Sequence, residues 1–316
     1  MTQGRKKLFT RAPLRRGRLN PWHRTVFQGF WHGPRMGVLH RACLRSFTEL
    51  GHRFLLYTYE PVDTPDGVEL VDANEIIPFR EMFHYRNPIT GRDDPGPFSD
   101  LFRFRLLGTR GGWWTDIDTV CLSSDIPEVD DAWAPEFPEH SPTDIGTSQL
   151  ALGQGSDLAQ VLYMECLALS RSGFPRRESL GPNLLSRVIE ERGLLRDNFG
   201  STALFYPIRW IEAFKLWLPH FTDEILCKTA GATFLPLYQS VAQYQGVDVS
   251  KPPPAGSYLD QICERFEITS DEGLHQDAET VRSNARSYFV ENDWAGETMR
   301  RVAGGESTLV ALGVRS

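Results

Sequence analysis

The sequence lacks the features that define several common classes of protein. No apolar run approaches the length needed to cross a bilayer, and no apolar segment of a secretion signal follows the first residues. The cysteines are few and show no zinc-type spacing, so we expect reduced thiols in a cytoplasmic protein. The net charge of -7 argues against nucleic acid as the main partner.

One stretch lacks acidic residues entirely. Residues 5–24 contain eight basic side chains and no Asp or Glu. One interpretation of residues 1–24 is a solvated, flexible basic arm. The other is peripheral contact with anionic lipid at the inner face of a membrane, worth about 1 kcal/mol per basic residue near the surface.

The next part of the chain alternates strand and helix patterns. Residues 25–33 form a strand-like run ending in a glycine turn, 36–50 have helical periodicity, and 53–59 are again strand-like. This order predicts a right-handed βαβ unit in a parallel sheet, with ligands beyond the carboxyl ends of the strands. Further expected strands are 68–71, 76–79, 147–153, 203–206 and 233–237, and further expected helices are 158–169 and 184–191.

The composition changes at residue 251, where a lysine precedes three prolines. The proline run suggests a stiff linker. Helical patterns follow at 258–266 and 279–289. We therefore divide the chain into the basic arm, a main α/β domain over 25–250, and a mostly helical extension over 251–316.

The segment 99–120 carries the chemistry. It predicts a helix with Ser99 as N-cap, a break at Gly111 and Gly112, and then an extended segment. If that segment is a strand, Asp116 and Asp118 leave from the same face. Two such carboxylates can hold a hard divalent cation and leave coordination positions open for phosphate oxygens.

Another pair of charged residues lies on the helix before the glycines. Asp100 and Arg103 are three residues apart and share a helix face, so a surface ion pair is one interpretation. The other is that both face the same ligand as the aspartates. The ordered combination in one short segment favours the second interpretation.

This combination resembles the sugar-nucleotide-binding region of DXD glycosyltransferases. That group includes capsular-polysaccharide transferases, yeast-type initiating mannosyltransferases and the glucosyltransferase domains of large clostridial toxins. The pattern Ser-Asp-x-x-Arg, Gly-Gly, aromatic, Asp-x-Asp is matched by Ser99, Asp100, Arg103, Gly111, Gly112, Trp114, Asp116 and Asp118. Residues 30–33 are similar to the family's first-strand signature. Gly181-Pro182 before a helix also resembles the family, in which this dipeptide lies near the donor and acceptor groove. The resemblance covers roughly residues 25–243.

The resemblance implies a GT-A-like mixed sheet flanked by helices and a retaining transferase that depends on Mn²⁺ or Mg²⁺. The expected donor is a nucleotide-sugar, most commonly a UDP-sugar in this group, and the acceptor a glycan or lipid-linked glycan such as a surface polysaccharide. Asp116 and Asp118 would hold the metal. The expected catalytic residues are Asp100, Arg103, Asp116 and Asp118, and the expected donor-binding residues are Trp31, His32, Gly33, Asp100, Arg103, Trp114 and Asp116.

One position departs from the family pattern. Many relatives carry a metal-binding or diphosphate-binding His where this chain has Pro236, with His32 and His220 as candidate substitutes. A nucleotide-sugar-binding module without turnover is therefore one alternative. Another is a haloacid-dehalogenase-type phosphohydrolase, because Asp116-Ile-Asp-Thr-Val also matches the opening motif of that class.

Overall fold

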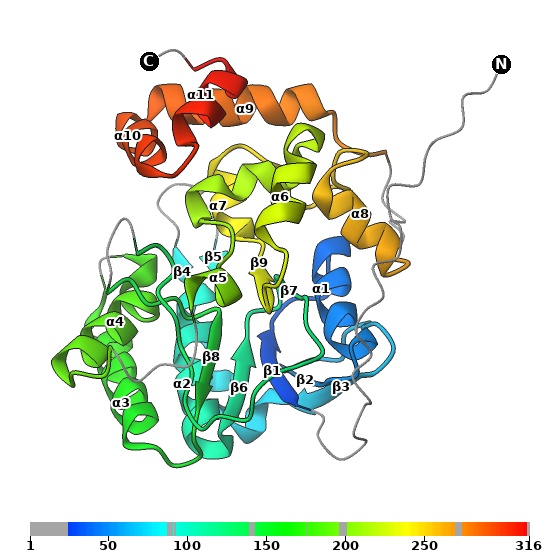
Figure 1. Cartoon of the computed structure of the whole chain (residues 1–316). Helices are drawn as coiled ribbons and strands as arrows, with labels where there is room; N and C mark the ends of the chain where they lie inside the picture. Colours follow the sequence, from blue (N-terminus) through cyan, green and yellow to red (C-terminus); the bar gives the residue numbers. More distant parts are fainter. Residues whose placement is uncertain are drawn as a thin grey trace.

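A five-stranded sheet forms the centre of the fold (Figure 1). The computed structural model describes residues 25–86, 91, 93–138, 143–174, 176–195, 201–268 and 274–314, so the basic arm lies outside the described residues. The strand order is β3-β2-β1-β6-β8, in which the first four strands are parallel and β8 is antiparallel to β6. Its strands are β1 (Val26–Trp31), β2 (Arg53–Thr58), β3 (Val68–Asp72), β6 (Gly112–Thr115) and β8 (Gln149–Leu152).

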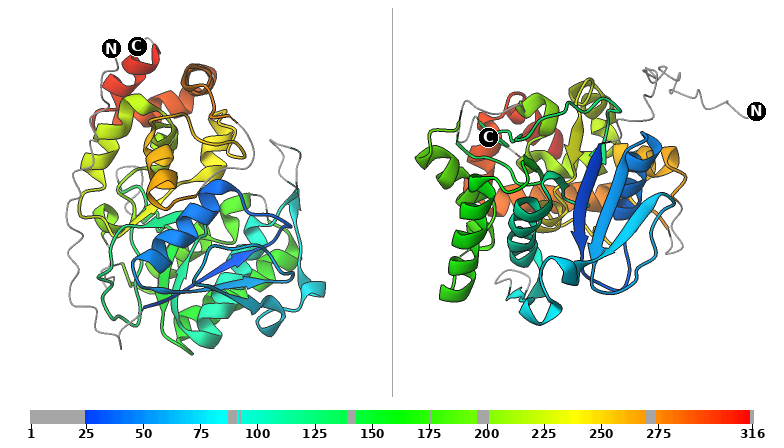
Figure 2. Two further views of the ribbon diagram at one scale, coloured as in Figure 1. Left: turned by 90° about the vertical axis from the view of Figure 1, so that its right-hand side faces the viewer. Right: turned by 90° about the horizontal axis from the view of Figure 1, so that it is seen from below.

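Both faces of this sheet are covered by helices (Figures 1 and 2). Alternation along the strands sends Trp113 into one buried cluster and its neighbour Trp114 into the other. The cluster that contains Trp113 includes α1 (Val38–Glu49), and the cluster that contains Trp114 includes α2 (Gly96–Arg110), α3 (Asp157–Ser172) and α4 (Pro182–Glu191). The expected α/β class, mixed sheet and flanking helices are confirmed.

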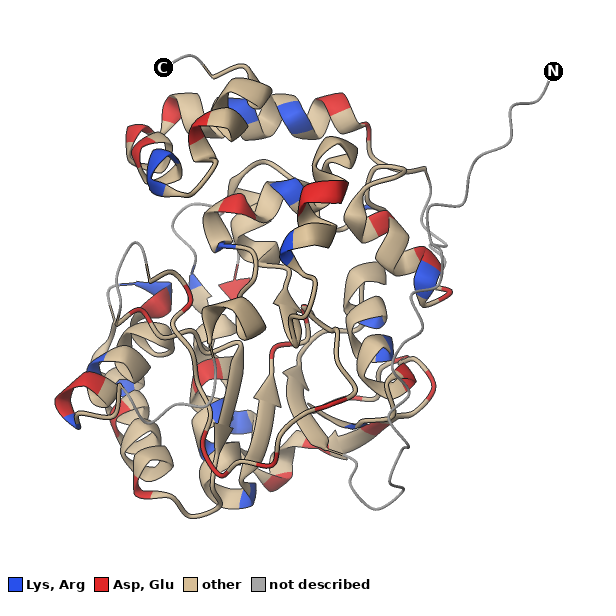
Figure 3. Ribbon diagram, viewed as in Figure 1, with Lys and Arg blue, Asp and Glu red and all other residues tan. Residues whose placement is uncertain are grey.

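Two smaller antiparallel pairs accompany the main sheet. The strand β7 (Thr119–Cys121), which follows β6 after a short turn, pairs with β9 (Phe234–Pro236). The strand β4 (Tyr85–Arg86) pairs with β5 (Asp93–Asp94) before α2. The β7–β9 pair brings residues near 236 back beside the turn that follows β6. In Figure 3, β6 and β8 carry no charged residue, whereas charged residues lie on the surrounding helices and loops.

Two of the expected strands are wrong. Residues 76–78 lie between two short 3-10 helices, η1 (Ala73–Glu75) and η2 (Phe79–Glu81), and residue 79 begins the second. The Asp72 carboxylate accepts the Asn74 N–H and starts a helical turn there. Residues 203–206 lie mostly in a short helix, α5 (Thr202–Phe205). An apolar run of four residues does not distinguish a buried strand from a buried helix.

The remaining elements lie beyond the carboxyl edge of the sheet and in the C-terminal part. They are η3 (Arg177–Ser179), η4 (Trp210–Trp217), η5 (Pro219–Phe221), α6 (Thr222–Lys228), α7 (Gln239–Tyr244), α8 (Tyr258–Arg265), α9 (Ala278–Glu291), α10 (Asp293–Arg301) and α11 (Gly305–Leu312). Within the described part of the chain, every helix is too short or too polar to cross a bilayer. The predicted helices 258–266 and 279–289 are confirmed, and the division at residue 250 stays a prediction.

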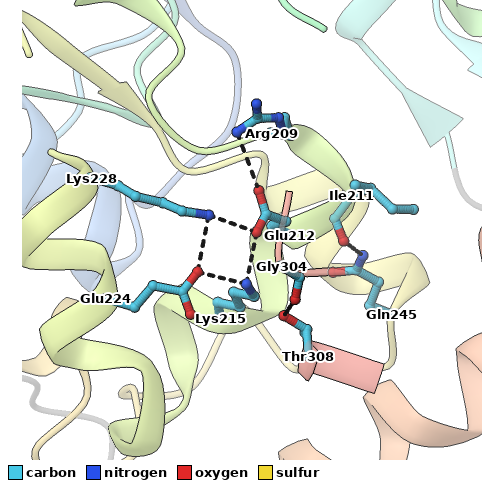
Figure 4. Close-up of polar contacts among 9 residues, drawn as sticks. All are labelled: Arg209, Ile211, Glu212, Lys215, Glu224, Lys228, Gln245, Gly304 and Thr308. Atoms are coloured by element: carbon cyan, nitrogen blue, oxygen red, sulfur yellow. Dashed lines mark hydrogen bonds and ion pairs between the residues drawn. The ribbon is translucent and has the colours of Figure 1, made fainter. Parts of the chain in front are cut away.

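A buried cluster of charges lies beneath the C-terminal helices (Figure 4). Glu212 on η4 is fully buried and its Oε1 receives Lys215 Nζ at 2.7 Å and Lys228 Nζ at 2.9 Å. Both ammonium groups also contact Glu224 Oε1. Because α9 and α10 pack against η4, this network lies under the surface on which the C-terminal helices rest.

Removing one member of this network should be costly. We expect Glu212→Gln to lower the free energy of unfolding by about 3–5 kcal/mol, because the buried Lys215 and the partly buried Lys228 lose a shared carboxylate partner. Glu297→Gln, which breaks an exposed pair with Arg301, is the matched control and should cost about 0–1 kcal/mol. Urea denaturation at neutral pH measures both, and equal losses would contradict a central role for Glu212.

Candidate functional site

The Asp-x-Asp motif lies in a turn at the carboxyl edge of the sheet. The strand β6 ends at Thr115, and the Thr119 N–H donates to the Asp116 carbonyl at 3.1 Å, which closes the turn before β7. The expected continuous strand through Asp118 is therefore wrong, because this local hydrogen bond reverses the chain. The negative charge of Asp116 contributes to the raised pKa of Asp118.

A glutamine from the antiparallel edge strand holds the two ends of this turn together. The Gln149 Nε2 group donates to Thr115 Oγ1 and to Thr119 Oγ1, at 2.9 Å in each case, and Gln149 is fully buried. Gly29 lies beneath the turn, where an added Cβ would meet the Thr115 carbonyl at 3.0 Å. The turn is thus fixed from two neighbouring strands, by residues that no sequence motif identifies.

Arg103 connects the helix and the turn. Its Nη2 donates to Asp116 Oδ1 at 2.7 Å and its Nη1 forms an ion pair with Asp100 Oδ1 at 2.9 Å. The guanidinium lies over the Trp114 ring, 4.8 Å from the centroid, and Trp114 Nε1 donates to the same Asp116 oxygen at 2.8 Å. Only 3% of the Arg103 side chain is exposed. The structure therefore assembles Asp100, Arg103, Trp114 and Asp116 through direct contacts.

Asp118 is held by the segment that follows β9. Its Oδ2 accepts the backbone N–H of Gln239 at 3.1 Å, and its carbonyl accepts the N–H of Leu237 at 2.9 Å. Pro236, the position considered for a metal-binding His, pairs with Thr119 in the small sheet. The Gln239 side chain is buried and its Nε2 has no hydrogen-bond partner among the described residues. Gln239 is thus a polar residue beside Asp118 that lies outside the sequence motif.

Negative charge is in excess at this site. Asp100 and Asp116 share the buried guanidinium of Arg103, and Asp118 accepts a backbone N–H instead. The three carboxylates and this one guanidinium together leave two negative charges uncompensated. Burial raises the pKa of Asp118 to about 6, with a further contribution from the charge of Asp116. Burial also raises the pKa of Asp100 to about 6, against the opposing charge of Arg103. The excess equals the charge of one divalent cation.

A fourth carboxyl group, that of Glu136, is affected by these charges. Burial, followed by the negative charge of Asp144, raises the pKa of Glu136 to about 8, and the charges of Asp116 and Asp118 act in the same direction. Glu136 is therefore largely protonated at neutral pH. It was not identified from the sequence because it follows a proline in an irregular segment without a motif.

The start of α4 packs directly on Asp100. A Cβ added at Gly181 would lie 2.5 Å from both carboxylate oxygens of Asp100, so only glycine fits there. Asn183, a weak site candidate from the sequence, is exposed on the first turn of α4. The expected N-cap at Ser99 is wrong, because α2 begins at Gly96 and the Ser99 N–H already donates to the Pro95 carbonyl.

The aromatic candidates lie at the end of β1. Since β1 and β6 are parallel neighbours, Trp31 and Asp116 lie along the same edge of the sheet. Trp31 Nε1 donates to the Gly33 carbonyl at 2.9 Å, and its ring packs against His40. The His32 ring lies between Phe79 and His84, and burial, then the charge of His84, lowers its pKa. No contact between described residues joins these three to the aspartates.

The histidines proposed as substitutes do not complete a metal site. His220 packs against Phe221 on η5, and no contact in the described ranges joins it to Asp116 or Asp118. Across those ranges, no three His, Cys, Asp or Glu side chains converge as a ready-made metal site. A cation at the turn would thus depend on two carboxylates, with a bound anion or water supplying further ligands.

Comparison with known proteins leaves the interpretation to these residues. No protein-family model matches the sequence, and no curated protein matches it. Eighteen chains of solved structures match. One, described as PaToxG glycosyltransferase, aligns with a TM-score of 0.40 and 11% identity over 80% of this chain and 88% of that chain. A similarity at this level carries no argument about function.

The raised pKa of Asp100 predicts an unusual pH dependence. A carboxyl group whose pKa is higher in the folded than in the unfolded state favours folding below pH 4 and loses this contribution as the pH rises through about 6. Asp100→Asn removes the titration. As the pH rises from 4 to 7, we expect the free energy of unfolding of the native protein to fall relative to that of the variant, by on the order of 3 kcal/mol. Urea denaturation across this range measures the difference; a relative loss would show that Arg103 outweighs burial.

The contact of Gly181 with Asp100 gives a second prediction. Gly181→Ala must displace either α4 or the Asp100 carboxylate, and we expect a loss of about 1–3 kcal/mol in the free energy of unfolding. Gly108→Ala on α2 is the matched control, because its added Cβ meets Ala159 at an ordinary 3.5 Å. The control should be neutral or slightly stabilising. Equal stability of the two variants in urea denaturation would contradict the close contact.

Proposed function

We propose that the protein is a metal-dependent, retaining glycosyltransferase that moves a sugar from a nucleotide-sugar, with a UDP-sugar as the expected donor, to a glycan or lipid-linked acceptor such as a surface polysaccharide. One observation carries the proposal. The motif residues Asp100, Arg103, Trp114 and Asp116 form a single contact network beside Asp118, at the carboxyl edge of a largely parallel sheet. This is the edge at which α/β sheets bind ligands.

The chemistry of the donor set fits a hard divalent cation. Asp116 Oδ1 is occupied by Arg103 and Trp114, and Asp118 Oδ2 by Gln239, so each carboxylate has a second oxygen outside these bonds. Asp116 and Asp118 would hold Mn²⁺ or Mg²⁺, which as a Lewis acid would stabilise the negative charge that develops on the diphosphate leaving group. The two uncompensated negative charges match the charge of such an ion.

The side chains around the carboxylates have separate tasks in this proposal. Arg103 fixes the orientation of Asp116 and Asp100, because both of its terminal nitrogens are engaged by them. Asp100 can accept hydrogen bonds from sugar hydroxyl groups through its remaining capacity. Gln239 can supply an amide donor or, with the amide reversed, an oxygen ligand beside Asp118. Trp31 can stack on the nucleotide base, with His32 and Gly33 lining the same strand end.

The proposal is tested by donor binding and turnover. We expect a panel of nucleotide-sugars to include one that raises the melting temperature in the presence of Mn²⁺, since a ligand at a hundredfold excess over its Kd stabilises the folded state by about 2.7 kcal/mol. Asp118→Ala should lower metal-dependent hydrolysis or transfer of that donor by about a hundredfold or more. Asp66→Ala, at an exposed carboxylate, is the matched control.

The outcomes separate the alternatives. Full activity in Asp118→Ala would refute the site. Binding of a nucleotide-sugar without hydrolysis or transfer would favour a binding module. Hydrolysis of a generic phosphate ester without any response to nucleotide-sugars would instead favour a phosphohydrolase.

A further inference from the structure

A second arginine lies beside the carboxylates and belongs to no motif. Arg177 is on η3, about 70 residues after Arg103, and its Nε donates to Asp94 Oδ2 at 2.6 Å. Asp94 precedes α2 and also accepts the Gly96 N–H through Oδ1 at 2.7 Å. Asp94 thereby ties Arg177 to the start of the helix that carries Asp100 and Arg103.

Arg177 also lies against the first residue of α2. A Cβ added at Gly96 would lie 2.7 Å from Arg177 Nη2, and Gly181, four residues beyond Arg177, packs on Asp100. The guanidinium therefore lies at the start of α2, the helix that carries Asp100, and on the segment that leads to the contact of Gly181 with Asp100.

The two arginines differ in their availability to a ligand. Arg103 is 3% exposed, with both Nη atoms paired to carboxylates, and it could not turn to an anion without releasing them. Arg177 is 33% exposed, and its pair with Asp94 uses Nε, so its terminal Nη hydrogens lie outside that pair. A guanidinium held through Nε can present its two Nη groups together to two oxygens of a phosphate.

We infer that Arg177, anchored by Asp94, binds the diphosphate of the nucleotide-sugar, and that Arg103 instead positions the metal-binding turn. This inference rests on the proposed function and assigns a substrate-binding residue to it. The physical need is clear: a diphosphate that enters beside Asp100 and Asp118 meets two carboxylates, and a cationic side chain on the same side offsets their repulsion.

The test uses the full chain and probes that do not depend on the donor sugar. Isothermal titration calorimetry measures Kd for UDP and for pyrophosphate, each with Mn²⁺, and for Mn²⁺ alone. We expect Arg177→Gln to raise Kd for UDP and pyrophosphate about 10- to 100-fold, the range for one charge-assisted hydrogen-bonding group. Binding of Mn²⁺ alone should change less than about twofold. Arg187→Gln, whose side chain pairs with Glu165 and Glu191 on a nearby surface, is the control and should bind as the native protein does.

Each other outcome overturns the inference. Unchanged Kd values in Arg177→Gln, with binding by the native protein, would refute the role of Arg177 and leave the proposed function intact. A parallel loss of Mn²⁺ binding would show that Arg177 only supports the carboxylates. Failure of the native protein to bind either anion would refute the proposed function itself. If circular dichroism shows that Arg177→Gln is unfolded, the same titrations are made with Arg177→Lys, which keeps the charge but lacks the planar guanidinium. Native affinity of Arg177→Lys for both anions would refute the inference.

Discussion

The ion pairs of Arg103 determine the geometry of the whole site. One buried guanidinium pairs with the Asp100 carboxylate on α2 and with the Asp116 carboxylate in the turn after β6. The same guanidinium packs on the face of the Trp114 ring. The attraction within a buried ion pair offsets the cost of removing both charges from water only when the geometry is good and further hydrogen bonds are made. Here the Trp114 indole N–H and the Arg103 guanidinium both donate to the same Asp116 oxygen. Arg103 thereby connects the helix α2 directly to the turn, which Gln149 and the segment after β9 hold from other sides.

The same arrangement leaves the site short of positive charge. Burial of Asp100 and Asp118 makes their ionised forms costly, and one guanidinium cannot compensate three carboxylates. A protein that keeps such an imbalance at the ligand-binding edge of its sheet has a ready reason to bind a cation there. The excess negative charge is thus the physical basis of the proposed metal dependence. In the same proposal, Arg177 would give the diphosphate a contact separate from the metal.

The local parts of this site could be predicted from the sequence, and the distant parts could not. Asp100 and Arg103 share a face because they are three residues apart, and Gly111 adopts the positive φ that its place after α2 suggested. Gln149 and Gln239 reach the turn from segments 30 and 121 residues away, and no periodicity or spacing links them to it. The same holds for Gly181 and Arg177. The turn after β6 is not predictable in this way, because the residues on both sides favour strands and the hydrogen bond from the Thr119 N–H to the Asp116 carbonyl has no sequence signature.

The most direct measurement of the central claim is anomalous X-ray scattering at the manganese edge, from crystals of the full chain grown with Mn²⁺ and UDP. We predict one anomalous peak within coordination distance of oxygens from both Asp116 and Asp118, in contact with the diphosphate. A peak elsewhere, or bound UDP with no manganese at this turn, would contradict the account.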